Sequence, residues 1–228
     1  MRTAVTQQTQ TESVRCLFEC KTAMHTRFAT MRAVSFTVDH MPYRSCTETE
    51  LVATAQSVLL LLTALLFGFG EDATLPHSDT AKLLIEVWGV KQALAATGLF
   101  AEAETHSAAI SWHNWACVQA KRRTLLSLNH LEWAWSVQAG YPVLTCFELG
   151  PLYAPAAGYL WRATKQSTWE ASYIDWLRKW SGEGYRMAEF FHLDPAKPLD
   201  RRSEMWLAEA DEFGMVLMAE ANAVVPAG

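Results

Sequence analysis

The chain has 228 residues, half of them hydrophobic and ten of them Trp, and a net charge of -5. This is enough apolar material for one sizeable core, and because no linker is evident we expect a single domain. The acidic balance argues against nucleic-acid binding, which needs a clustered basic face. The only tight basic groups are Lys121–Arg123 and Arg201-Arg202. We therefore expect small molecules or proteins as partners, and no direct contact with nucleic acid.

The five cysteines form neither an even disulfide set nor paired CxxC units. Cys16 and Cys20, one helical turn apart, could bind zinc together with His25, but no second pair of ligands follows. Reduced, structural thiols are the better interpretation, with no metal and no other cofactor. Residues 1–12 are polar and lack the apolar run of a signal peptide, so we expect a loose tail ahead of one domain over residues 13–228. These features favour an intracellular, cytoplasmic protein.

The first predicted helices lie in the N-terminal third of the chain. Apolar residues at helical spacing predict a helix over Ser13 to Thr37. Leu51 to Phe69, within a second helix over Glu48 to Gly70, carries no charge and is long enough to span a bilayer. However, acidic residues flank it, no basic residue sets an orientation, and Gln56 and Ser57 fall in its interior. We therefore interpret it as a buried core helix and expect no membrane span.

Two further helices follow. Asp79 to Thr97 is predicted to be helical and to end at Gly98, with Leu83, Leu84, Val87, Val90 and Leu94 facing inward. The longest helix is predicted from Ser111 to Gln138, capped by Ser111 and ended by Gly140, and at ~1.5 Å per residue it is roughly 40 Å long. Its bulky residues occupy more than one face: Trp115, Val118, Arg122, Leu125, Asn129 and Trp133 on one, and Trp112, Leu128, Leu131 and Trp135 on another. This distribution predicts a central helix that is packed on most sides.

The composition changes after Gly140, because residues 141–161 contain three prolines. This composition predicts an ordered, non-helical, aromatic-rich loop that covers the core. Helices are then predicted over Ser167 to Trp180, Tyr185 to Phe191, and Asp200 to Ala223. The last of these places Met205, Trp206, Phe213, Val216 and Leu217 inward. No alternating strand pattern appears, so the predicted fold is an all-α, single-domain helical bundle around one long central helix.

A spaced pattern of Trp, Arg and Pro runs from about Leu51 to Trp180. It comprises Trp112 and Trp115, Arg122-Arg123-Thr124, Leu131-Glu132, Cys146 to Leu149, Pro151-Leu152, Ala154-Pro155, Leu160-Trp161, Trp169-Glu170, Tyr173 and Trp176-Leu177. This pattern resembles the regulatory domain of fungal-specific transcription factors, also called the middle homology region. The resemblance implies an all-α domain of a nuclear regulator that senses metabolites or contacts other proteins.

The sequence departs from that family in two respects. The zinc-bearing DNA-binding module is missing, because the chain offers neither six clustered Cys nor paired Cys and His. The acidic residue often found ahead of the paired arginines is Gln119 here. A regulator without a DNA-binding module cannot bind a promoter by itself, which favours another role.

Polar groups on the apolar faces of the longest helix are the best local indication of a site. They are Gln119, Arg122, Asn129 and His130, flanked by Trp115, Leu126 and Trp133. In a structural interpretation, Arg122 and Arg123 pair with Glu132, Glu148 or Glu170 and tie helices together. In a functional interpretation, Gln119, Asn129 or His130 lines a cavity and orients a ligand carbonyl or carboxylate.

Two functions remain open, and the chain shows no recognised catalytic motif. The first is a stand-alone small-molecule protein of fungal secondary metabolism, acting without cofactor as a cyclase, isomerase or pericyclase, for example in a [4+2] cycloaddition, on an apolar terpenoid or polyketide intermediate. The second is a transcription-factor-like regulatory module that binds an effector and lies in the nucleus. The candidate catalytic residues are Gln119, His130 and Tyr141; the candidate ligand-binding residues are Trp115, Arg122, Leu126, Asn129, Trp133 and Tyr153. Nothing in the sequence indicates an oligomer.

Overall fold

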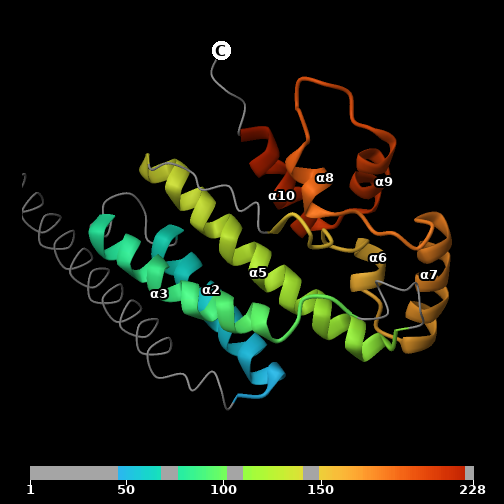
Figure 1. The fold of residues 1–228 in the computed structure, drawn as a ribbon, viewed down its shortest axis with the longest axis horizontal. Coiled ribbons are helices and arrows are strands. Elements are labelled where there is room, and N and C mark those ends of the chain that lie inside the picture. Colours follow the sequence, from blue (N-terminus) through green and yellow to red (C-terminus); the bar gives the residue numbers. More distant parts are fainter. Residues whose placement is uncertain (1–45, 68–76, 102–109, 141–148, 224–228) are drawn as a thin grey trace, which may run out of the picture. The chain divides into compact units, whose positions relative to one another are not determined.

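The computed structural model describes residues 46–67, 77–101, 110–140 and 149–223. Within them the regular elements are α-helices: α2 (Glu48–Phe67), α3 (His77–Ala96), α5 (Trp112–Ala139), α6 (Gly158–Trp161), α7 (Gln166–Lys179), α8 (Met187–Phe191), α9 (Arg201–Glu209) and α10 (Glu212–Ala223) (Figure 1). These residues contain no strand and one isolated β-bridge, between Tyr153 and Arg186. The all-α prediction is therefore confirmed for the described part of the chain.

The chain divides into two compact units, residues 1–92 and 93–228, and the division falls within α3. The predicted Ser13 to Thr37 helix and the three possible zinc ligands lie outside the described residues. The prediction that residues 13–228 form a single domain stays a prediction.

The α2 helix of the first unit begins with a capping box. Thr47 N donates to Glu50 Oε2 at 2.9 Å, and Glu50 N donates to Thr47 Oγ1 at 3.3 Å. Only one face of α2 is buried, formed by Leu51, Ala55, Val58, Leu62 and Leu65, whereas Leu60 is 71% exposed. By length and composition α2 could cross a membrane, but one such helix is weak evidence. Its interpretation as a core helix stays a prediction.

The α3 helix follows its predicted pattern closely. All five residues expected to face inward are buried: Leu83, Leu84, Val87, Val90 and Leu94. The helix ends at Ala96, and Gly98 takes up a φ of 88°, which only glycine adopts readily.

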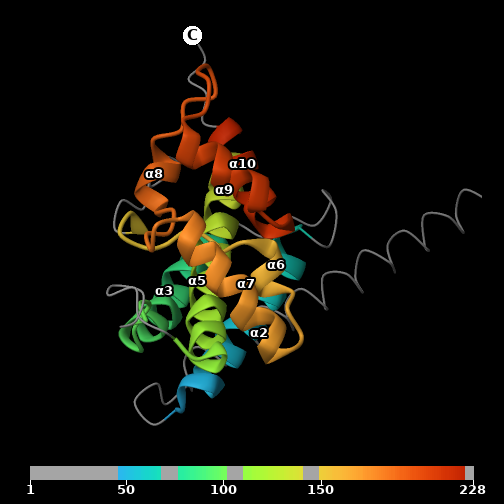
Figure 2. The ribbon, with the colours of Figure 1, turned by 90° about the vertical axis from the view of Figure 1, so that its right-hand side faces the viewer.

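The α5 helix is the central helix of the second unit, and both its predicted caps are present. The Ser111 side chain accepts from Asn114 N, and Gly140, at a φ of 70°, donates its backbone N–H to Ser136 O and Val137 O. In Figures 1 and 2, α7 lies beside the N-terminal end of α5 and α10 beside its C-terminal half. Packing on several sides buries even charged residues of α5, including Arg122 and Arg123.

The predicted covering loop is buried as expected where the structure describes it. Residues 152–157 are buried although they form no helix or strand. Backbone hydrogen bonds fix this segment to the chain around α8: Ala154 N donates to Tyr185 O, Met187 N to Leu152 O and Ala188 N to Gly150 O, at 2.8, 2.8 and 2.9 Å. These bonds satisfy backbone groups that burial would otherwise leave unpaired.

The prediction that residues 141–161 contain no helix is wrong at the C-terminal end. Gly158–Trp161 form the single helical turn α6. The last proline of the stretch is Pro155, which lies far enough ahead to leave the amides of this turn free to bond: Arg162 N donates to Gly158 O at 3.0 Å. The predicted helices over 167–180 and 185–191 correspond to α7 and α8.

The predicted helix from Asp200 to Ala223 is also wrong as a single element, because it breaks into α9 and α10. Ala210 has φ −60° and ψ 143°, which is extended backbone. The break lets Asp211 cap α10 by accepting from Gly214 N at 3.1 Å, and lets its carboxylate reach Arg123. Of the residues expected to face inward, Trp206 and Leu217 are buried, but Val216 is 45% exposed.

Candidate functional site

Aromatic rings of α5 and α7 pack directly on one another in the second unit. Trp115 of α5 lies with its ring centroid 5.3 Å from that of Trp169 and 6.5 Å from that of Tyr173. Along α7, Tyr173 stacks on Trp169 at 4.6 Å and on Trp176 at 5.8 Å, and Trp176 lies 6.1 Å from Trp180. Residues three and four apart share a helix face, so the sequence spacing produces this continuous aromatic face.

The aromatic contacts continue through Tyr185 to Trp206 of α9, and the polar atoms of these two side chains form hydrogen bonds. Tyr185 stacks on Trp206 with ring centroids 5.3 Å apart and lies 6.4 Å from Trp180. Trp206 Nε1 donates to Pro155 O at 3.0 Å, and the Tyr185 hydroxyl lies 2.7 Å from Ser203 Oγ. These bonds fix the orientation of the rings.

A pocket lies between these rings and the buried 153–157 segment. Its lining includes Trp115, Gln119, Arg122, Tyr153, Ala154, Pro155, Ala156, Ala157, Leu160, Tyr173, Trp176, Leu177, Trp180, Gly182, Gly184, Tyr185, Trp206 and Glu209. The pocket has a volume of about 570 Å³ when the space open to solvent is counted, but the centre of a water molecule can reach only about 30 Å³ of it. That is room for two or three waters at roughly 10–15 Å³ each, so a larger guest requires side chains to move.

Gln119 is a deeply buried polar residue of the pocket lining. It is 2% exposed, and its Oε1 accepts from Ala156 N at 3.4 Å. The other end of the amide, Nε2, has no hydrogen-bond partner among the residues that the structure describes. Gln119 can therefore offer a donor to a bound molecule.

Arg122 is fully buried and tightly held. Its Nε donates to Leu99 O at 2.6 Å, and its guanidinium carbon lies 5.2 Å from the ring centroid of Tyr153 and 5.7 Å from that of Phe100. These contacts fix the cation between two aromatic rings. Tyr153 is itself oriented by Arg186, whose Nη2 donates to the Tyr153 hydroxyl at 3.3 Å.

Glu209 brings a carboxylate to the pocket that the sequence pattern did not indicate. Its side chain is 9% exposed and accepts from Lys179 Nζ and, at 3.0 Å, from Trp180 Nε1. Burial, together with the negative charge of Glu209 and a hydrogen bond to it, raises the pKa of Tyr159 to about 12. Glu209 is thus tied to α7 and α6 rather than free to act as a base.

The structure brings four of the predicted site residues to the pocket, namely Trp115, Gln119, Arg122 and Tyr153. Leu126, Asn129, His130 and Trp133 are not among its lining residues. Asn129 Nδ2 donates to Leu125 O within its own helix, at 2.9 Å. His130 stacks on Trp133 at 5.4 Å, and its Nδ1 lies 3.0 Å from Glu220 Oε2. Tyr141 lies outside the described residues.

The expected pairing of Arg123 with a carboxylate is present, but the partner is Asp211 at 2.8 Å. Of the acids proposed from the sequence, Glu170 accepts instead from Gln166 Nε2 at 2.8 Å, and Glu148 lies outside the described residues. Burial lowers the pKa of Arg123, and the charge of Asp211 opposes that effect. The pairing depends on the break between α9 and α10, which the sequence did not indicate.

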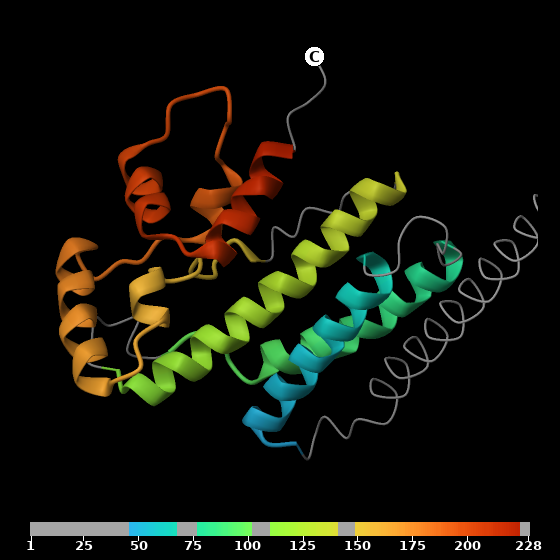
Figure 3. The ribbon, with the colours of Figure 1, turned by 180° about the vertical axis from the view of Figure 1, so that it is seen from behind.

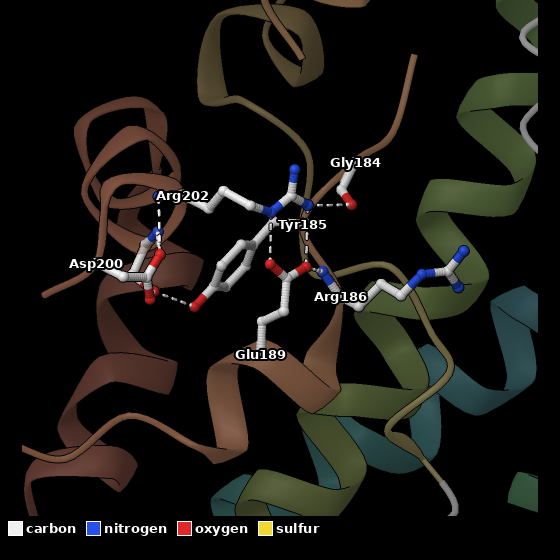
Figure 4. Close-up of polar contacts among 7 residues, drawn as sticks. Gly184, Tyr185, Arg186, Glu189, Asp200 and Arg202 are labelled. Atoms are coloured by element: carbon white, nitrogen blue, oxygen red, sulfur yellow. Dashed lines mark hydrogen bonds and ion pairs between the residues drawn. The ribbon is translucent and has the colours of Figure 1, made fainter. Parts of the chain in front are cut away.

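The segment between α7 and α8, whose ribbon is seen from behind in Figure 3, contributes Gly184 and Tyr185 to the pocket wall. A polar network holds this segment in place (Figure 4). Arg202 donates through Nε to Glu189 Oε2 at 2.6 Å and through Nη2 to Gly184 O at 3.1 Å. Burial alone would raise the pKa of Glu189, but hydrogen bonds from Arg202 and from the Arg186 backbone outweigh it and lower the pKa. The network thus positions one wall of the pocket.

Comparison of the chain with protein-family models, with curated proteins and with solved structures finds no match in any of the three. The resemblance to the regulatory domain of fungal transcription factors therefore stays a prediction from the sequence pattern.

Proposed function

We propose that this protein binds an apolar small molecule in the pocket between α5, α7 and α9, and acts on it as a cofactor-free cyclase, isomerase or pericyclase. The supporting observation is an aromatic-walled pocket whose lining includes Gln119, with an Nε2 donor that has no partner among the described residues. Small-molecule sites typically combine apolar walls with a few placed polar groups. A terpenoid or polyketide intermediate of fungal secondary metabolism has the matching chemistry.

Catalysis in such a pocket would come from shape and from one polar contact. Holding a flexible apolar chain in reactive geometry removes several kcal/mol of the barrier in favourable cases, up to about 7–11 kcal/mol. A hydrogen bond from Gln119 to an activating carbonyl would add on the order of 2–4 kcal/mol. Of the three candidate catalytic residues, Gln119 alone lies at the pocket among the described residues. Because the preformed space is small, binding must displace a side chain, and half-buried Trp176 is the best placed to move.

A matched pair of substitutions on α7 tests the binding site. Leu177 lines the pocket, so Leu177→Phe should fill it and weaken ligand binding at least about tenfold, by the loss of about 1.4 kcal/mol. Ile174 lies on the same helix, is 49% exposed and does not line the pocket, so Ile174→Phe should leave binding unchanged. Binding is measured by quenching of tryptophan fluorescence with candidate terpenoid and polyketide intermediates. Equal affinities in the two variants would place the ligand elsewhere.

Turnover separates the enzyme from the alternative function, an effector-binding regulatory module. The Trp, Arg and Pro pattern in the sequence favours that alternative. The purified protein is incubated with each ligand, and product formation is compared with the uncatalysed background. A rate above background that Leu177→Phe abolishes supports the enzyme. Saturable binding without turnover rejects the enzyme and leaves the regulatory module.

A further inference from the structure

The Gln119 amide has a single allowed orientation. Its oxygen faces the backbone N–H of Ala156, at 3.4 Å. An N–H group can only donate, so the amide end that faces it must be the acceptor, Oε1. This hydrogen bond therefore decides which end of the amide is the oxygen and which is the nitrogen. Nε2 must therefore point away from Ala156.

The Nε2 donor has no partner among the residues that the structure describes, and Gln119 as a whole is only 2% exposed. Two acceptors at the pocket are bonded to other groups. Glu209 accepts from Lys179 and Trp180, and Pro155 O accepts from Trp206 Nε1. Nε2 is therefore available to donate to an acceptor that a guest supplies.

We propose that the guest carries a neutral carbonyl group, which accepts a hydrogen bond from Gln119 Nε2, on an otherwise apolar body. This inference rests on the proposed function and specifies its substrate class. A carboxylate fits less well, because Arg122, the cationic side chain of the lining, already donates to Leu99 O and lies between two aromatic rings. A neutral carbonyl needs only the single donor that Gln119 provides.

Two ligands of similar size test the carbonyl preference: 2-acetylnaphthalene and 2-ethylnaphthalene, which differ in having or lacking the carbonyl oxygen. Their Kd values for the full chain are measured by tryptophan quenching. One net hydrogen bond predicts that the ketone binds roughly 2- to 13-fold more tightly than the hydrocarbon. Gln119→Met keeps the side-chain length but removes the donor, so the ratio of Kd values should fall to about one.

Gln119→Glu is the second variant, and thermal melts establish that each variant is folded. Its carboxylate can still accept from Ala156 N–H but presents an acceptor to the pocket in place of the donor, so the preference for the ketone should be lost or reversed. A ratio of one in the wild type, or a ratio that survives in both variants, overturns the carbonyl inference alone. If neither naphthalene binds saturably, or if Leu177→Phe changes neither Kd, the proposed binding site itself fails.

Discussion

Arg123 of α5 and Asp211, at the break between α9 and α10, form a buried ion pair with 2.8 Å between Nη1 and Oδ2. Their side chains are 11% and 4% exposed, so water screens the pair little. The same aspartate caps α10 by accepting from Gly214 N. Asp211 therefore links the start of α10 to α5.

Replacing Asp211 by Asn should lower the free energy of unfolding by about 3–5 kcal/mol, because it leaves a buried guanidinium without its counter-charge. Asn is a good N-cap residue, so the Gly214 bond can persist and the loss reports the ion pair. The control is Asp175→Asn, which breaks an ion pair with Arg178 whose side chains are both 75% exposed. It should cost less than about 1 kcal/mol. Similar losses in urea unfolding of the two variants would show that burial of the first pair carries no special weight.

Gly140→Ala should destabilise the protein through its backbone alone. Gly140 has a φ of 70°, and an added Cβ would meet none of the described atoms within 4 Å. The expected loss is about 1–2 kcal/mol, the cost of left-handed backbone for a residue with a Cβ. Gly140→Asn should lose less, since Asn tolerates this conformation better. Urea denaturation measures both variants, and an equal loss would argue against a conformational cause.

Tyr159 should make the protein less stable at alkaline pH. Its pKa is raised to about 12, from 10.0, by burial and by Glu209, so the folded state favours the neutral phenol. Stability that is full below pH 10.0 is therefore lost as the pH rises towards about 12. Tyr159→Phe should reduce this loss, measured as the unfolding free energy across that range, with tyrosinate absorbance reporting the titration. The same alkaline slope in the variant and the wild type would assign the loss to another group, such as Tyr185, whose pKa is also raised.

Protonation of Glu189 should make the protein less stable at acidic pH. Its pKa is lowered from 4.5, so the stability it provides is present above pH 4.5 and is lost as the pH falls through the lower, folded-state pKa. Glu189→Gln should destabilise the protein at neutral pH by on the order of 1 kcal/mol, because the contact with Arg202 is only partly buried. The difference from the wild type should shrink under acid conditions. A difference that is constant with pH would show that the charge of Glu189 does not matter.

The helices with strong local signals could be predicted from the sequence. Ser111 and Gly140 mark the ends of α5, and both make the expected capping bonds. The break at Ala210 could not be predicted, because neither proline nor glycine marks it. It is favoured by the contact of Asp211 with Arg123, a residue distant in the sequence, and local periodicity does not report such contacts.

Helical spacing in the sequence could predict which residues of α5 share one face, and so part of the site. Trp115, Gln119 and Arg122 share the pocket, as their spacing suggested. His130 lies further along α5, where its Nδ1 contacts the carboxylate of Glu220 of α10. Spacing cannot show which neighbour covers each turn of a helix. For the same reason Glu209 was missed, since its role depends on α7 residues that approach it in space.

The wall formed by residues 154–157 has a consequence for engineering the protein. It consists of three alanines and one proline, and backbone hydrogen bonds pin it in place. Such a wall offers few side chains to vary, so the shape of the pocket is best varied on the α7 surface. A combinatorial library restricted to Trp176 and Leu177 would retune which molecules are accepted while the scaffold behind them stays intact.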